Sequence, residues 1–157
     1  MKKRRLWLVA GVLLTLVLSG GILLLPYGGT DAAAKKAGAV SSNDVYVLSK
    51  IIHGEARGET YLGQVAVGAV IVNRVKNPNF PNSVYGVVFE PGAFTAVSDG
   101  QYYTNPSSSA VKAAQSAING WDPSGGALYY WNPSTSTSRW IWSRRIIARI
   151  GKHVFGR

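Results

Sequence analysis

The fold is decided by residues 41–59, SSNDVYVLSKIIHGEARGE. Serines at the start can cap a helix, and Asp44 falls in the first turn, where the helix dipole favours an anion. The apolar residues recur at helical spacing and form one face, made by Val45, Leu48, Ile51 and Ile52. Gly54 weakens the helix, so we expect Glu55 at or just past its C-terminal end.

The segments that follow alternate between regular and irregular patterns. Residues 61–77 and 107–120 have the spacing and capping signals of helices, whereas residues 78–106, with four prolines and three glycines, are expected to be mostly irregular. Residues 127–133 have strand composition, and residues 139–155 predict one or two more short strands. This order predicts an α+β domain, with several helices and a short antiparallel sheet from the C-terminal third.

The N-terminus has the pattern of an export signal or anchor, which we place at residues 1–27. Four basic residues at positions 2–5 precede an uncharged run over residues 6–27. This run is long enough to span a bilayer, which favours a retained anchor, but Ala32 and Ala34 also offer a cleavage site. Residues 28–42 indicate a linker, so the folded domain is expected at residues 43–157.

Composition narrows the classes of function. The chain has no cysteine, which excludes a thiol nucleophile, cysteine-ligated zinc and iron–sulfur clusters. Its net charge is +10, which suits nucleic acid, anionic lipid or an anionic wall polymer. Because the leader predicts export, either anchored and facing outward or secreted to the wall, the polymer is the expected partner and nucleic acid is not. The leader would also contact the membrane.

No cofactor or metal site is predicted. His53 and His153 are the two histidines of the chain, and neither belongs to an H-E-x-x-H motif or an aspartate cluster. No G-x-S-x-G elbow appears, so serine-hydrolase chemistry is disfavoured too. His53 is therefore interpreted as an orienting or structural residue.

The acidic residues are few enough to examine one by one, since the chain has seven. Asp44 has a capping explanation, and Asp122 precedes a proline in a turn. Glu55 follows an apolar helix face, where desolvation favours the protonated carboxyl that a general acid requires. An exposed carboxylate paired with Arg57 is the alternative. The neighbouring glycines, which let a substrate approach closely, favour a catalytic role.

Aromatic residues are concentrated near the C-terminus, in a set formed by Trp121, Tyr129, Tyr130, Trp131, Trp140 and Trp142. In a strand, Tyr129 and Trp131 would share one face and Tyr130 would take the other; Trp140 and Trp142 would likewise share a face. One such set can fill the core while another lines a groove on which sugar rings stack. Basic residues nearby would suit peptides that carry carboxyl groups.

Four stretches carry a family resemblance in order along residues 43–157: IIHGEARGETYLGQVAVGAVIVNRV, FPNSVYGVVFEPGAFTAVSDGQ, NGWDPSGGALYYWNP and WIWSRRIIARIGKHVFGR. Together they resemble the catalytic domain of the spore cortex-lytic enzymes in the cell wall hydrolase family. The resemblance implies a fold similar to lysozymes and lytic transglycosylases. It also implies cleavage of peptidoglycan, as in cortex lysis during germination, with Glu55 as the essential acid/base.

Three functions remain open at this stage. A lytic transglycosylase needs one acid/base, because the C6 hydroxyl of muramic acid closes a 1,6-anhydro ring. A lysozyme-type hydrolase needs a second carboxylate, about 5 Å away as a nucleophile or up to about 9.5 Å away to activate water. A noncatalytic module would bind peptidoglycan without cleaving it. The glycines around Glu55 make a continuous helix to Glu59 doubtful, so we favour the one-acid route.

The remaining site predictions concern substrate contacts. Glu59 is expected to hold Arg57, a loop or a sugar hydroxyl. Ser98 is expected to line the groove, and so are three residues of the predicted strand and its end, namely Tyr129, Trp131 and Asn132. No regulatory partner protein can be identified.

Overall fold

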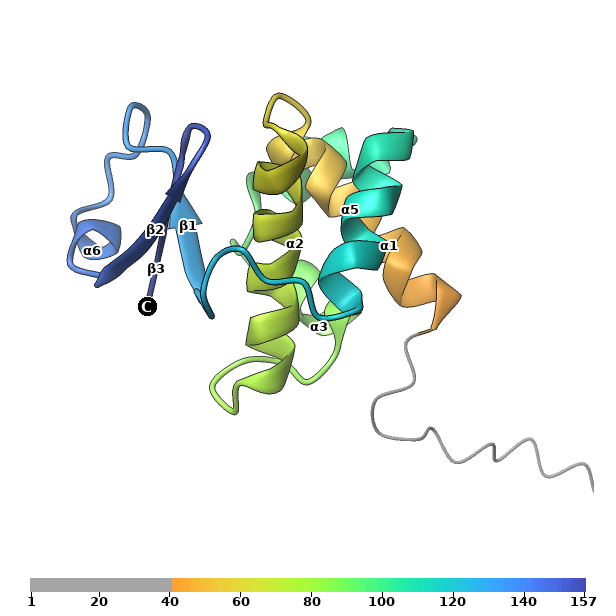
Figure 1. The fold of residues 1–157 in the computed structure, drawn as a ribbon, viewed down its shortest axis with the longest axis horizontal. Coiled ribbons are helices and arrows are strands. Elements are labelled where there is room, and N and C mark those ends of the chain that lie inside the picture. Colours follow the sequence, from red (N-terminus) through yellow and green to blue (C-terminus); the bar gives the residue numbers. More distant parts are fainter. Residues whose placement is uncertain (1–40) are drawn as a thin grey trace, which may run out of the picture. The chain divides into compact units, whose positions relative to one another are not determined.

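The structure is a computed structural model that describes residues 41–157 (Figure 1). The predicted leader, and all of the predicted linker except Ser41 and Ser42, lie outside the described residues. The described chain forms a group of helices followed by a three-stranded sheet, which confirms the predicted α+β class. Within residues 41–157, no helix combines the length and hydropathy required to cross a bilayer.

Helix α1 (Ser42–Ala56) begins with a reciprocal cap. The Ser41 hydroxyl accepts the Asp44 N–H at 3.1 Å, and the Asp44 carboxylate accepts the Ser41 N–H at 3.2 Å. The helix continues past Gly54, where an added Cβ would lie 2.5 Å from the Cβ of Ala96. Gly54 therefore permits the close approach of another segment, and Glu55 lies one residue before the helix ends.

Helices α2 (Tyr61–Lys76) and α5 (Ser108–Ile118) pack against α1 and confirm both predicted helices. The interior of α2 is buried almost all round, which explains its lack of a polar face. Gly68 lets the three helices meet, because an added Cβ would lie 2.8 Å from Ile52 and 3.1 Å from Ala117. Helix α2 ends before Asn77 and Pro78, where proline disfavours helical backbone in the preceding residue.

Short helical turns interrupt the segment that was expected to be mostly irregular. They are α3 (Val84–Val88), α4 (Thr95–Ser98) and the 3₁₀ turn η1 (Gln101–Tyr103). Each turn contributes buried side chains to the main core, among them Val87, Ala96 and Tyr102. Helix α4 and η1 both pack against α1, which brings this segment beside Glu55.

The sheet contains β1 (Tyr129–Trp131), β2 (Ile146–Ile150) and β3 (His153–Gly156) in the order β1-β3-β2, with both pairs antiparallel. This confirms the predicted short antiparallel sheet. Side chains alternate between its faces. Tyr130 and Phe155 pack against the main core, whereas Trp131 and Val154 belong to a second, smaller cluster with Ile141.

The one or two strands expected from residues 139–155 correspond to β2 and β3, whereas Arg139–Trp142 form a helical turn, α6, so Trp140 and Trp142 do not lie on a strand as expected. The turn directs Ile141 into the small cluster against Trp131 and leaves Trp140 and Trp142 about half exposed. A strand would put the two tryptophans on one face and Ile141 on the other. Packing of Ile141 thus overrides the strand propensity of the aromatic residues.

Candidate active site

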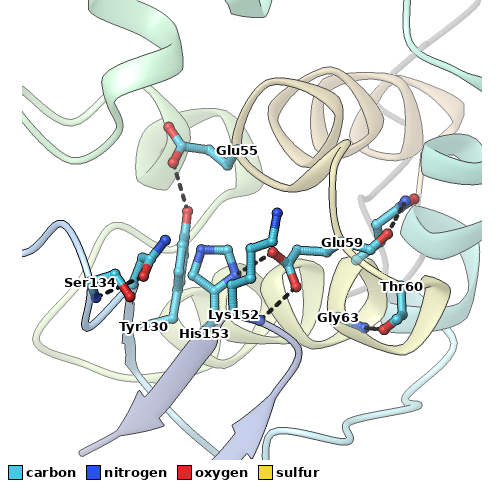
Figure 2. A network of polar contacts seen from close by, with 10 residues as sticks. Glu55, Glu59, Thr60, Gly63, Tyr130, Ser134, Lys152 and His153 are labelled. Carbon is cyan, nitrogen blue, oxygen red and sulfur yellow. Dashed lines mark hydrogen bonds and ion pairs between the residues drawn. The ribbon is translucent and has the colours of Figure 1, made fainter.

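Glu55 has a hydrogen-bond donor on each carboxylate oxygen. Its Oε1 accepts the backbone N–H of Ala96 at 2.8 Å, and its Oε2 accepts the hydroxyl of Tyr130 at 3.1 Å. Figure 2 shows the Tyr130 hydroxyl pointing up from the sheet toward the carboxylate. Helix α1, helix α4 and strand β1 therefore all contribute to this position, and the side chain is only partly buried.

Tyr130 is a candidate site residue that the sequence did not single out. Burial, and then the charge of Glu55, raise the pKa of Tyr130 well above its usual range, so the phenol keeps its proton and remains a donor. The strand alternation already placed Tyr130 on the opposite face from Tyr129 and Trp131. What the alternation could not show is that this face meets the end of α1.

Glu59 lies in the turn between α1 and α2 and contacts the hairpin that joins β2 to β3. Its Oε2 accepts the backbone N–H of Lys152 at 3.0 Å, and its side chain is 6% exposed. Gly151, at φ +59°, leaves space for that carboxylate, which an added Cβ would overlap. Glu59 was expected to hold Arg57, a loop or a sugar hydroxyl. The structure shows the second of these, because Glu59 binds the loop between β2 and β3.

His153 lies between Glu59 and Tyr130 (Figure 2). Its Nδ1 is 3.8 Å from Oε1 of Glu59, which is beyond hydrogen-bond distance, and its ring meets the Tyr130 ring edge-on at 5.2 Å between centroids. Burial lowers the pKa of His153 more than the charge of Glu59 raises it, so a neutral ring is favoured. Glu59, His153, Tyr130 and Glu55 therefore form one contiguous set of contacts.

His53 has a structural contact, as the sequence interpretation expected. Its Nδ1 accepts the backbone N–H of Ser107 at 3.3 Å, which connects α1 to the residue that caps α5. In the described part of the chain, no three His, Asp or Glu side chains gather as a metal site would require.

The predicted substrate contacts come from separate elements: Ser98 ends α4, Tyr129 and Trp131 share the face of β1 opposite Tyr130, and Asn132 follows that strand. Ser98 is exposed at the end of α4, and its hydroxyl donates to the carbonyl of Thr95 at 2.9 Å. Trp131 is 6% exposed and packs in the small cluster. Asn132 accepts the N–H of Ser134 at 2.9 Å, which holds the turn after β1. Substrate binding by each of these residues stays a prediction.

Tyr129 is half buried between two cations and two aromatic rings. Its ring lies 6.2 Å from Phe80 and 5.1 Å from Trp140, and the guanidinium of Arg74 is 5.7 Å from its centroid. Burial lowers the pKa of Arg74, whose Nε donates to the Leu128 carbonyl at 2.7 Å. Ser98 therefore lies at the end of α4, the helix whose Ala96 N–H binds Glu55, whereas Tyr129 packs against Trp140 of α6.

The arrangement around Glu55 suits proton transfer. The Ala96 amide and the Tyr130 phenol hold the carboxylate in one orientation. Glu59 is four residues away but has its carboxylate turned to the hairpin. The site therefore holds one oriented carboxylate, which is the arrangement that acid/base chemistry at a single group requires.

Comparisons with known proteins find similar sequences and a similar fold. The profile of the family described as Cell Wall Hydrolase matches residues 58–156. A spore cortex-lytic enzyme from Bacillus cereus is 61% identical over 115 residues, which are 73% of this chain and 44% of that protein. The chain thus spans less than half the length of this curated relative.

Two solved structures are also similar. The catalytic domain of the Bacillus cereus SleB protein has 60% identity and a TM-score of 0.71, with 74% of this chain and 91% of that one covered. The catalytic domain of the germination-specific lytic transglycosylase SleB from Bacillus anthracis has 59% identity and a TM-score of 0.72, with 76% and 98% covered. Profile, sequence and fold agree, and the chain belongs to the cell wall hydrolase family.

Proposed function

We propose that the domain cleaves the glycan strand of peptidoglycan, with Glu55 as the acid/base. The observation that carries the proposal is the pair of donors on Glu55, the Ala96 N–H and the Tyr130 hydroxyl, at a partly buried position. Similarity to the catalytic domain of a germination-specific lytic transglycosylase supports this reaction class. The names of the relatives support spore cortex as the substrate.

The proposed reaction is a lytic transglycosylation at the linkage between muramic acid and glucosamine. Glu55 gives its proton to the glycosidic oxygen, and the bond to the muramic acid anomeric carbon breaks. The C6 hydroxyl of the same sugar then attacks that carbon and returns a proton to Glu55. The products are a 1,6-anhydro end and a free glucosamine C4 hydroxyl, so no water is consumed.

The position of Glu59 favours this route over hydrolysis with two carboxylates. A lysozyme-type mechanism needs a second carboxylate that faces the substrate, as a nucleophile or as a base for water. The Glu59 side chain is 6% exposed, with one oxygen bound to the Lys152 N–H and the other beside His153. A group held in this way is poorly placed to approach a sugar ring.

Mass spectrometry of released muropeptides tests the proposal. Purified cortex peptidoglycan is digested with residues 41–157, and the fragments are compared with those from a Glu55→Gln preparation. We expect anhydro-muramic ends that disappear in the variant. Reducing ends would instead establish hydrolysis, and binding without any released fragment would establish a noncatalytic module.

We also propose that the protein is exported and held at the membrane by residues 1–27. The basic residues at positions 2–5 and the uncharged run over residues 6–27 support this location. Fractionation of cells that produce the full chain, followed by N-terminal sequencing, is the test. A mature protein that starts after Ala34 and is released into the medium would contradict the anchor.

A further inference from the structure

A line of stacked side chains leads from the start of α4 to the surface at α6. It begins at Phe94, the residue before α4, and the guanidinium of Arg74 lies 5.4 Å from the Phe94 centroid. Arg74 also lies over Tyr129, as described above. Tyr129 meets Trp140 edge-on at 5.1 Å, and the Arg144 guanidinium lies 4.6 Å from the Trp140 centroid.

The outer end of this line is exposed and basic. Trp140 is 53% exposed, Arg139 and Arg145 are exposed, and Arg144 is partly so. No aspartate or glutamate follows Asp122 in the sequence. Within residues 41–157, the one close contact between a carboxylate and a basic side chain is that of Glu59 with His153, so Arg139, Arg144 and Arg145 have no carboxylate partner in this range. We call these four residues the Trp140 surface.

The chemistry of the Trp140 surface matches a particular part of the proposed substrate. An exposed indole face stacks on a sugar ring or a peptide plane, and guanidinium groups bind carboxylates through paired hydrogen bonds. The glycan of peptidoglycan carries its carboxylates mainly on the stem peptides attached to muramic acid. The arginines around Trp140 therefore match the charge of these stem-peptide carboxylates.

We propose that the Trp140 surface binds the stem-peptide carboxylates of peptidoglycan, as an extension of the site at Glu55. The inference rests on the proposed function, because it takes the same polymer as the ligand. Strand β1 connects the two places, because Tyr130 donates to Glu55 and the neighbouring Tyr129 packs against Trp140. Arg74 and Phe94, which continue the line to α4, are buried. Recognition of stem peptides would give the domain a preference for strands that still carry them.

An anionic membrane is the rival ligand for a surface that combines tryptophan and arginine. Interfacial helices bind lipid through a long apolar face that is buried at the headgroup boundary. Helix α6 has four residues, and its apolar side chain Ile141 is turned inward to the small cluster. The exposed area therefore suits a narrow polymer better than a lipid surface.

The test measures binding in the Glu55→Gln background, so that the polymer is not degraded. Sedimentation with intact peptidoglycan is compared with sedimentation with peptidoglycan whose stem peptides an amidase has removed. Arg139→Gln with Arg145→Gln is the first variant, since both side chains are exposed and the fold should persist. Arg144→Gln is the second, and Lys112→Gln, an exposed cation on α5, is the matched control.

We expect the double variant to bind intact peptidoglycan about tenfold more weakly, the factor that a charge-assisted hydrogen bond supplies. The control should bind like its parent, and on stripped glycan the difference between parent and double variant should vanish. Equal binding by parent and double variant to intact polymer would overturn the proposal. An equal loss of binding to stripped glycan would overturn it too. So would a loss of binding that appears in parallel sedimentation with phosphatidylglycerol vesicles and not with peptidoglycan.

These outcomes are independent of whether the domain cleaves its ligand. Failure of the proposed function would appear as intact protein that releases no fragments. If the Trp140 surface does not bind stem peptides, the arginine variants will bind intact and stripped peptidoglycan as their parent does. All of these proteins carry Glu55→Gln, so cleavage does not affect the result. Circular dichroism of each variant shows whether a loss of binding reflects a loss of fold.

Discussion

The end of α1 and the turn that follows it each hold one glutamate, and the two have different surroundings. Glu55 is partly buried and receives one donor from α4 and one from β1. Glu59 is almost fully covered and binds the hairpin between β2 and β3. One carboxylate is oriented where a substrate can reach it, whereas the other fastens the sheet to the helices. Proximity in sequence therefore does not make them a catalytic pair.

Replacing each glutamate by glutamine gives the largest expected contrast. Glu55→Gln should lower peptidoglycan cleavage by about 10²–10⁴-fold, because the amide cannot transfer a proton. Glu59→Gln should keep most activity, because its amide oxygen can still accept the Lys152 N–H. Release of muropeptides per unit time is the measurement. Equal losses in the two variants would show that both carboxylates take part in the chemistry.

Tyr130→Phe should have the next largest effect. It removes the donor to Oε2 of Glu55 while it keeps the ring that packs on His153 and Phe155. We expect activity to fall about tenfold, in line with the loss of a hydrogen bond to a charged group. Tyr103→Phe, at a side chain 64% exposed, is the control. Identical kinetics in the two variants would remove Tyr130 from the site.

Gly151→Ala tests the fastening at Glu59. The left-handed backbone disfavours alanine, and the new Cβ would overlap the Glu59 carboxylate. The free energy of unfolding should fall by about 1–2 kcal/mol from the backbone alone, and further from the overlap. Urea denaturation with and without Glu59→Ala separates the two contributions. If Glu59→Ala relieves none of the cost, the carboxylate is not confined by Gly151.

The smallest expected effect is a pH dependence of stability at His153. Burial lowers the pKa of His153 below the usual value of 6.5, so the unfolded chain binds this proton at a higher pH than the folded protein does. The stability that the neutral ring contributes is present above pH 6.5 and is lost as the pH falls toward the lower folded pKa. Urea midpoints of the parent should therefore fall more steeply than those of His153→Phe across this window.

Glu59→Gln sharpens the same measurement. The charge of Glu59 raises the pKa of His153 against the effect of burial, and Glu55 adds to it, while Lys152 lowers that pKa. Removing the Glu59 charge should lower the pKa of His153 further, so stability should be lost more steeply with acid. Parallel curves for parent and Glu59→Gln would show that the 3.8 Å contact carries little electrostatic interaction.

Sequence patterns predicted the helical part well because its signals are local. The cap at Ser41, the apolar spacing in α1 and the stop before Pro78 each involve residues within one or two turns of each other. Gly54 illustrates the limit of such signals. A glycine at this position suggested a weakened helix, whereas it permits Ala96 to approach, and that contact depends on a residue 42 positions later (96 − 54).

The C-terminal part was predicted less completely because its structure depends on packing between segments. Strand composition located β1, β2 and β3. It also extended the expected strand region over RWIW, which forms the helical turn α6. The placement of Ile141 against Trp131 and Val154 decides that turn. The irregular segment likewise forms short helices because its apolar residues reach the core.

The sequence by itself determined that Glu55 stands at the end of an amphipathic helix in a chain with few acids. It also determined the family, since the matching residues extend along most of the domain. Only the tertiary structure decided what each glutamate contacts. Tyr130 reaches Glu55 across 75 positions and Lys152 reaches Glu59 across 93, and no local pattern encodes contacts at such separations, because they form only when the sheet packs on the helices.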